Sequence, residues 1–288
     1  MAALAAGGEL AAAAGDTPTG AAVGAALVRA QGAVQALLWD APGGYFRAYS
    51  YNNDSALMAD ALYGAVIARG LGLGFLADPA QLASHLRAEA ARNSDPFGFV
   101  SITGRVTPPP DGNKPDDSKL WQQAAPDWSA LALQLGAAGP AGVNASAALD
   151  PARRQLDNWR SRLRSLWNLA GLTSATSGED AELSALPYCT AHYGFALTAY
   201  WLVPALTGQV TNIPAGKLTF EAAEALQCPW SLPALAAGFG GRISCDAGGA
   251  FTLGLAWGAL QLPAGGLSAG GRVYSEAVDL APGESVTW

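Results

Sequence analysis

The sequence predicts an α+β fold in which helices come first and strands come last. Up to about residue 207, apolar residues recur every three or four positions, which is typical of helices with one buried face. After about residue 212 the period changes to two, and glycine pairs separate short apolar runs, as in a small antiparallel sandwich. The alternating residues are Phe251, Leu253, Leu255 and Trp257, the last assigned to the core of its strand. We therefore expect a helical domain over residues 1–212 and a β-rich module over 213–288.

Aspartate residues followed closely by proline mark the beginning of several helices. A carboxylate accepts hydrogen bonds from the first free N–H groups, and proline fits the first turn. Such starts occur at Asp16, Asp78 and Asp150. Pro126 is expected to kink the helix that contains it. The expected helical segments are pieces of 1–38, then 54–70, a segment that begins at 78, 117–136, 150–171 and 191–206.

The segment that begins at Asp150 has the clearest helical pattern, because its apolar residues form one face and Gly171 ends it. The residues of this face are Leu156, Trp159, Leu163, Leu166 and Trp167. Residues 93–117, by contrast, contain five prolines and are expected to form an irregular loop.

The composition excludes several classes of function. Half of the 288 residues are hydrophobic and 14% are charged, so the chain can bury a sizeable core. A net charge of −7 argues against a nucleic-acid surface. There are only two histidines, and the three cysteines have no metal or redox spacing, so we expect no metal and no cofactor.

The sequence has no segment that predicts insertion into a membrane. Residues 1–15 lack the basic start and the compact apolar stretch of a signal peptide. The longest apolar run, 195–206, contains Pro204 and is too short to span a bilayer. We expect a soluble protein without a transmembrane segment, in the cytoplasm or at the periphery of a membrane.

Asp60 is the candidate catalytic residue. We expect a helix that begins near Asp54 or Ser55 and runs to about Gly70, which puts Asp60 in its second turn. No lysine or arginine lies three or four residues from Asp60, so burial favours the protonated form, which can act as a general acid. The alternative is an ordinary solvated, capping or structural aspartate.

Two segments carry a resemblance to a known family. Residues 55–64, Ser-Ala-Leu-Met-Ala-Asp-Ala-Leu-Tyr-Gly, followed by Arg69-Gly70-Leu71-Gly72-Leu73, resemble the acid/base segment of the non-lysosomal glucosylceramidase family (glycoside hydrolase family 116). The preceding Leu38-Trp39-Asp40 and Gly44-Tyr45-Phe46 resemble that family's hairpin. The resemblance implies that Asp60 is the general acid/base. It also implies an (α/α)6 toroid, of which this chain holds the C-terminal part, with the site at one mouth.

The same resemblance suggests substrate-binding residues. Tyr51 and Asn52 belong to the matched hairpin region, and Trp121 to a motif in which Lys119 replaces the family's glutamate. A later segment places Cys189 where the family has a sugar-binding arginine, and Asp180 where it has a glutamate. His192 follows in that segment, with a capping or core histidine as the alternative role. The candidates are therefore Tyr51, Asn52, Trp121, Asp180 and His192.

A retaining glycosidase needs a second carboxyl group about 5 Å from the first. In the family this nucleophile lies well upstream of the matched segment, and no glutamate of this chain has the right context. We therefore expect a β-glucosidase fragment that is inactive alone. Its substrate would be a β-glucoside, with glucosylated lipids among the compatible ones. The alternatives are a non-catalytic carbohydrate-binding or interaction module, and an inverting helical-toroid glycosidase.

Overall fold

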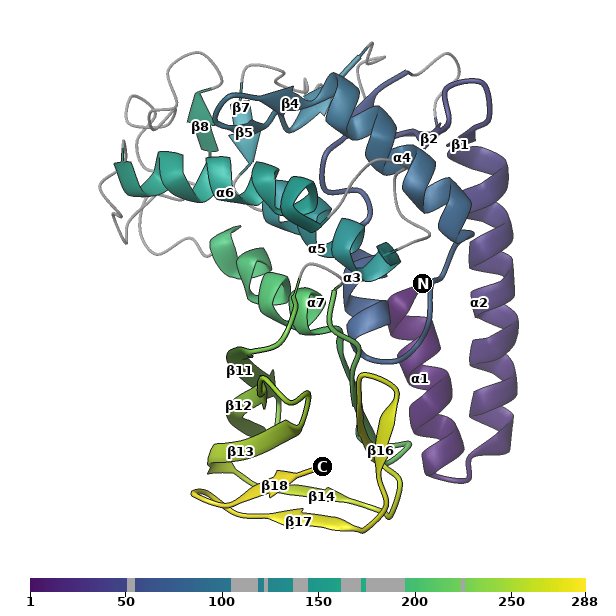
Figure 1. Cartoon of the computed structure of the whole chain (residues 1–288). Coiled ribbons are helices and arrows are strands. Elements are labelled where there is room, and N and C mark those ends of the chain that lie inside the picture. Colours follow the sequence, from purple (N-terminus) through teal and green to yellow (C-terminus); the bar gives the residue numbers. More distant parts are fainter. Residues whose placement is uncertain are drawn as a thin grey trace, which may run out of the picture. The chain divides into compact units, whose positions relative to one another are not determined.

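The computed structural model describes most of the chain as helices, strands and turns (Figure 1). The described residues are 1–50, 55–104, 119–121, 124–136, 145–161, 172–174, 195–223 and 226–288. They form two compact units. Unit 1 comprises Met1–Val28, Ala65–Leu76 and Val203–Trp288, and unit 2 comprises Arg29–Gly64 and Ala77–Leu202. The predicted domain boundary at 212/213 stays a prediction.

The predicted α+β class and the order of the elements are confirmed. Within the described residues, seven α-helices precede residue 208, and the larger sheets follow it. The last helix, α7 (Leu202–Thr207), ends one residue before the predicted break, and β9 (Gln209–Asn212) begins just after it. The described helices do not show a toroid, so that finer part of the prediction is taken up below as a proposal.

Two of the predicted helix starts are confirmed by capping hydrogen bonds. The Thr19 N–H donates to Asp16 Oδ1 at 3.1 Å at the start of α2 (Thr17–Leu37), which follows α1 (Ala2–Ala13). The Ala80 N–H donates to Asp78 Oδ1 at 2.8 Å at the start of α4 (Pro79–Arg92). Each carboxylate accepts a hydrogen bond from an N–H that has no partner within its helix.

The predicted helix over 117–136 begins later than expected. Residues Lys119–Trp121 form a strand, β7, which pairs antiparallel with β8 (Leu172–Ser174). The helix α5 spans Ala124–Leu135, so Pro126 lies in its first turn and does not interrupt it. Proline is compatible with this position because the first N–H groups of a helix have no intrahelical acceptor. The predicted kink is therefore wrong.

The predicted apolar face of the next helix is wrong at Leu156, whereas Trp159 is half-buried, and Leu163, Leu166 and Trp167 lie outside the described residues. Helix α6 (Ala145–Ser161) begins before Asp150 and includes Pro151. Leu156 is exposed, whereas the amide side chains of Gln155 and Asn158 are buried. The Ala125 N–H at the start of α5 donates to Gln155 Oε1 at 3.3 Å, so the buried amide satisfies a free helix end.

Part of the predicted irregular loop forms short strand pairs. β4 (Ser94–Asp95) pairs with β5 (Gly98–Phe99), and β6 (Ile102–Thr103) pairs with β3 (Leu57–Met58). The buried side chain of Asn93 joins these strands. Its Nδ2 donates to Leu57 O at 3.2 Å and to Val100 O at 3.0 Å, and its Oδ1 accepts from Thr103 Oγ1 at 2.9 Å.

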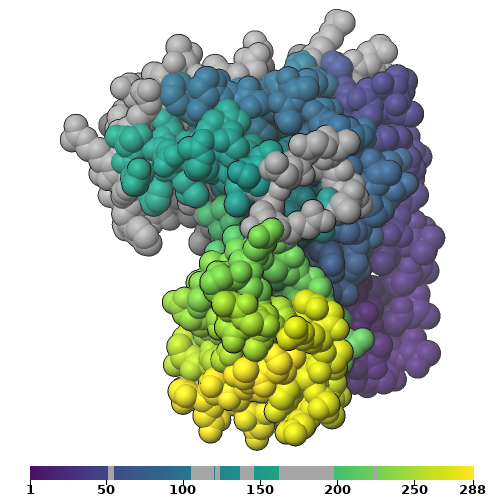
Figure 2. Space-filling view, in the orientation of Figure 1, coloured from purple at the N-terminus to yellow at the C-terminus, as the bar shows by residue number. Residues whose placement is uncertain are grey.

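The strands of unit 1 form two four-stranded sheets and one two-stranded sheet, coloured green to yellow in Figure 2. The first sheet has the order β16-β15-β10-β9, and its β10/β15 pair is parallel, which corrects the expectation of a wholly antiparallel module. The second, β11-β12-β13-β18, is antiparallel, as is the β14/β17 pair. Beyond β9 the strands are Lys217–Phe220 (β10), Trp230–Ala236 (β11), Phe239–Cys245 (β12), Phe251–Gly258 (β13), Leu260–Leu262 (β14), Leu267–Ala269 (β15), Arg272–Tyr274 (β16), Val278–Leu280 (β17) and Ser285–Thr287 (β18).

The alternating pattern of β13 is confirmed for Phe251, Leu253 and Leu255, which are buried, but not for Trp257, which is 51% exposed. The register of β12 and β13 shifts between Gly240 and Gly241. An extra residue in a strand turns the following side chain to the other face. The Trp257 ring lies against Gly240, where a Cβ atom would come within 2.2 Å of Nε1.

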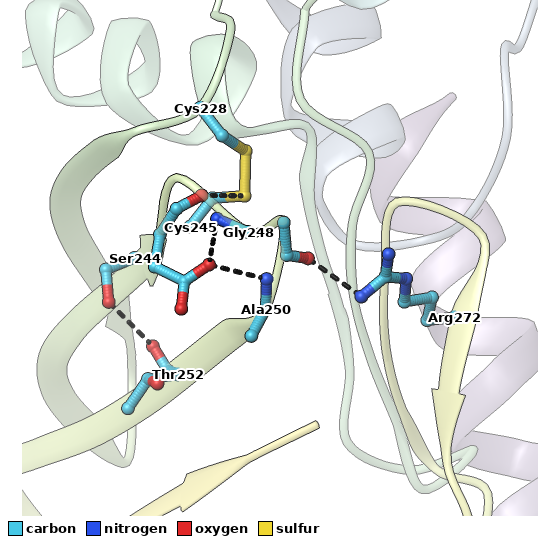
Figure 3. Close-up of a disulfide and its surroundings, with 9 residues drawn as sticks. Cys228, Ser244, Cys245, Gly248, Ala250, Thr252 and Arg272 are labelled. Carbon is cyan, nitrogen blue, oxygen red and sulfur yellow. Dashed lines mark hydrogen bonds between the residues drawn. A yellow bond between two sulfur atoms is a disulfide. The ribbon is translucent and has the colours of Figure 1, made fainter.

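A disulfide joins the two ends of the β11–β12 hairpin (Figure 3). Cys228 and Cys245 are 17 residues apart, and their Cα atoms lie 5.4 Å from each other. The turn after Cys245 is held by Asp246, whose Oδ1 accepts from the Gly248 and Ala250 N–H groups at 2.8 and 2.9 Å. The sequence analysis found no function for these cysteines, and the disulfide identifies two of them as structural.

Removing this disulfide should destabilise unit 1. A closed loop of this length lowers the entropy of the unfolded chain, and its loss costs roughly 3 kcal/mol. We expect the Cys228→Ala/Cys245→Ala variant to unfold at lower urea concentration by tryptophan fluorescence, and reduction of the wild-type protein to give the same midpoint. Ser244→Ala, which leaves the disulfide intact, is the matched control. An unchanged midpoint in the double variant would contradict the structural role.

Candidate functional site

Asp60 lies in a turn and not in a helix. The helix α3 spans Tyr63–Gly70, so the predicted start near residue 54 or 55 is wrong. The preceding β3 pairs with β6, and the Ala59 N–H donates to Ser101 O at 2.9 Å, which keeps this part of the chain extended. The argument from helical neighbours of Asp60 therefore does not hold. The side chain is half-buried, between β3 and α3.

The hairpin ahead of Asp60 is confirmed. β1 (Trp39–Asp40) pairs antiparallel with β2 (Tyr45–Phe46), with Trp39 opposite Phe46. The hydroxyl of Tyr45 donates to Ser55 O at 3.1 Å, and the Ala48 N–H donates to Ala56 O at 2.9 Å. The hairpin is thus tied to the segment that leads to Asp60.

The other predicted site residues cannot be placed beside Asp60. Tyr51, Asn52, Asp180 and His192 lie outside the described residues. The backbone of Trp121 is described in β7, where it pairs with Leu172, but its side chain is not. Their roles in binding substrate stay predictions.

The structure groups Asp60 with two buried carboxyl groups that the sequence analysis did not select. Glu89 lies on α4 and is 2% exposed, and Asp127 lies in the first turn of α5 and is 3% exposed. Burial, followed by the charges of Asp127 and Asp60, raises the pKa of Glu89 well above its ordinary value. Burial, followed by the charge of Asp60, does the same to the pKa of Asp127. The three carboxyl groups therefore interact.

His85 completes this group on α4, one turn before Glu89. The Phe46 N–H donates to His85 Nδ1 at 3.0 Å, so a neutral imidazole carries its proton on Nε2. Burial lowers the pKa of His85 to about 3. His85 Nε2 lies 3.6 Å from Glu89 Oε2, and because His85 is neutral at pH 7 this is a polar contact and not an ion pair.

Three polar atoms of this group lack a hydrogen-bond partner within the described part of the chain. They are His85 Nε2, Glu89 Oε1 and Asp127 Oδ1, and all three are inaccessible to solvent. An unsatisfied buried polar atom costs about 1–3 kcal/mol, so such atoms are uncommon in structural roles. Clusters of perturbed titratable groups are typical of functional sites. We call Asp60, His85, Glu89 and Asp127 the acid cluster.

The sequence contains a signal for Glu89. Leu82, His85, Leu86 and Glu89 follow the helical spacing that places residues on one face, and the two leucines show that this face is buried. An acid on a buried face is poorly solvated, unlike an acid on the outer face of a helix. Asp127 stands between Pro126 and Trp128 at the start of a strongly apolar helix, which is a weaker signal of the same kind.

Comparisons with known proteins assign no family to this arrangement. No protein-family model matches the chain, and no curated protein matches it. Among the described residues, no group of three or more His, Cys, Asp or Glu side chains could hold a metal ion. A search of the described helices for a membrane span finds none of sufficient length and hydropathy.

Glu89→Gln should remove a loss of stability that develops as pH rises above about 4.5. The folded pKa of Glu89 is raised above its ordinary value of 4.5, so its contribution is complete below that value and is lost as pH rises through the folded pKa. Glutamine stays neutral throughout. We expect the free energy of unfolding of the variant, measured in urea, to rise by at least about 1 kcal/mol relative to that of the wild type from pH 5 to pH 9. This is about the value of a pKa difference of one unit.

The control for this experiment is Asp157→Asn, which changes an exposed carboxylate of the same unit on α6. Its stability should follow that of the wild type within about 0.5 kcal/mol at every pH. Parallel pH profiles for Glu89→Gln and the wild-type protein would show that Glu89 is ionised in the folded state, contrary to our expectation.

Protonation of His85 should cause a loss of folding stability at acid pH. Its folded pKa of about 3 lies below the ordinary histidine value of 6.5, so the unfolded chain binds the proton first, and stability is lost as pH falls from 6.5 towards 3. The loss should reach on the order of 4 kcal/mol. His85→Asn keeps an acceptor for the Phe46 N–H and should flatten this limb. An unchanged slope in the variant would exclude His85 as its source.

Proposed function

We propose that this chain is part of a glycoside hydrolase that cleaves β-glucosidic bonds, with Asp60 as the general acid/base. The observation that carries the proposal is the grouping of Asp60 with Glu89 and Asp127 in unit 2, directly after the hairpin. The likeness of residues 55–64 to the acid/base segment of the glucosylceramidase family supports it independently.

In this proposal Asp60 protonates the oxygen of the leaving group and afterwards activates the water that completes hydrolysis. The half-buried position suits both steps, because the carboxyl group is accessible yet partly shielded from solvent. The hairpin bonded to Ser55 and Ala56 positions the segment from which Asp60 projects. The substrate is a β-glucoside, and a glucosylated lipid is compatible with it.

Neither buried acid suits the role of second catalytic carboxylate. A nucleophile or a general base has to be ionised, whereas burial raises the pKa values of Glu89 and Asp127 and so favours their protonated forms. The proposal therefore uses neither acid, and it takes the nucleophile of a retaining mechanism to lie upstream of this chain, as the resemblance to the glucosylceramidase family implies. The raised pKa values disfavour an inverting mechanism with either acid as its base.

The helical part of the chain is proposed as a portion of an (α/α)6 toroid. α2 supports this proposal because it buries none of its 21 residues and leaves Val28 and Leu37 exposed. Apolar side chains exposed along a helix are typical of surfaces that pack against another element. In a toroid such a helix would pack against neighbouring helices of the ring.

Asp60→Asn tests the proposal in a chain extended upstream to include the nucleophile. Turnover of a β-glucoside with a poor leaving group should fall by roughly 10²–10⁴-fold, because general acid catalysis contributes about that much. An activated aryl glucoside should lose less in its first step. Asp157→Asn should keep the wild-type rate, and an equal rate for Asp60→Asn would refute the assignment.

The chain of residues 1–288 alone should show no turnover of an activated aryl β-glucoside, since no covalent glycosyl-enzyme can form without the nucleophile. The assay is the release of the chromogenic aglycone. Robust turnover that Asp60→Ala abolishes would place a second catalytic carboxylate within these residues. It would then overturn the external nucleophile while keeping the role of Asp60.

A further inference from the structure

We propose that Glu89 and Asp127 are positioning residues for Asp60: they hold their protons permanently, so that Asp60 is the one carboxyl group of the acid cluster that exchanges a proton with the substrate. The inference rests on the proposed function only for the role of Asp60. Its chemistry requires no further reactant, because the proton leaves Asp60 for the oxygen of the leaving group and returns to Asp60 from water.

The packing of α4 is the first observation that supports the proposal. α4 packs against β2, β3 and α5, so Glu89 and His85 lie between the strand that leads to Asp60 and the helix that carries Asp127. Glu89 and Asp127 are almost completely buried, whereas Asp60 is half-buried. Only Asp60 can therefore exchange protons readily with a substrate or with water.

The second observation concerns polar atoms of the acid cluster that lack a hydrogen-bond partner. One oxygen of each buried acid, Glu89 Oε1 and Asp127 Oδ1, has no hydrogen-bond partner among the described residues, and neither has His85 Nε2, so at these two oxygens no donor stabilises an ionised form. Moving an unpaired charge into such surroundings is far more costly than keeping the group neutral. Burial is also the largest cause of both raised pKa values, ahead of the charge of Asp60.

Two arginine side chains of the surrounding elements, Arg92 and Arg154, bind to groups outside the acid cluster. The guanidinium of Arg92 donates to Ser55 O at 2.7 Å and to Thr103 O at 3.2 Å, and it lies 4.8 Å from the centre of the Tyr45 ring. Arg154 on α6 pairs with Asp150 at 3.0 Å. The remaining charged or titratable groups on α4, β1, β2, β4, α6 and η2 (Phe195–Trp201), within the described side chains, are Arg87, Asp40, Tyr45, Asp95, Asp150, Arg153, Asp157, Arg160 and Tyr200.

The consequence for Asp60 is electrostatic. When Asp60 gives its proton away it becomes a carboxylate, and a second carboxylate nearby would oppose that step. Two neutral acids in the same positions do not oppose it. Glu89 and Asp127 thereby keep Asp60 a stronger acid than it would be beside two ionised groups.

Carboxyl ¹³C NMR of the full chain tests this without any need for turnover. The signals of Glu89 and Asp127, assigned through Glu89→Gln and Asp127→Asn, should titrate above the ordinary range. In Asp60→Asn both midpoints should fall by about one pH unit, the size expected of directly coupled sites. In the wild type, the carboxyl signal of Asp60 should shift a second time at high pH, where Glu89 and Asp127 ionise. Glu89→Gln should reduce this second shift.

Asp157→Asn is the control and should move none of these midpoints. Ordinary midpoints for Glu89 and Asp127 would overturn the proposal, because the acids would then be charged at neutral pH. High midpoints that Asp60→Asn leaves unchanged would also overturn it, since the acids would then be merely structural. Confirmed coupling together with an Asp60→Asn enzyme of full activity would instead refute the proposed function alone.

Discussion

The burial of Glu89 and Asp127 is the constraint on which the candidate site depends. Two carboxyl groups lie inside unit 2 with no cation paired to them among the described residues. Ionising either group there would cost several kcal/mol, and a neutral acid is the form that such surroundings accept. The fold therefore favours the protonated form of both groups, and in our proposal Asp60 is the group whose protonation state changes.

Several other buried polar side chains of unit 2 form hydrogen bonds with backbone groups. Asn93 bonds to β3, to β6 and to Val100 between β5 and β6, Gln155 accepts from the start of α5, and Trp128 Nε1 donates to Leu86 O at 2.9 Å. These buried groups have partners, as most buried polar groups do. Unsatisfied buried atoms also occur elsewhere in the described part of unit 2, Trp159 Nε1 among them, so it is their combination with raised carboxyl pKa values that leads us to propose a function for the acid cluster.

Local signals allowed much of the fold to be predicted. Asp16 and Asp78 cap helices as their position before proline indicated, and the β1–β2 hairpin forms. The errors arise where distant segments decide the outcome. β3 is extended because it pairs with β6, some 45 residues later, and Gln155 is buried because the start of α5 needs an acceptor. Neither partner can be identified from the periodicity of one segment.

For the same reason, the acid cluster could be predicted only in part from the sequence. Asp60 was selected from the wrong local structure, since it lies in a turn ahead of α3 and not in a helix, and its catalytic role stays a prediction. Its relevant neighbours are 29 and 67 residues away in sequence, on α4 and α5. The spacing of Leu82, His85, Leu86 and Glu89 shows that one acid faces a core. Only the packing of α4 against α5 shows that this acid meets a second one, and that both lie close enough to Asp60 to respond to its charge.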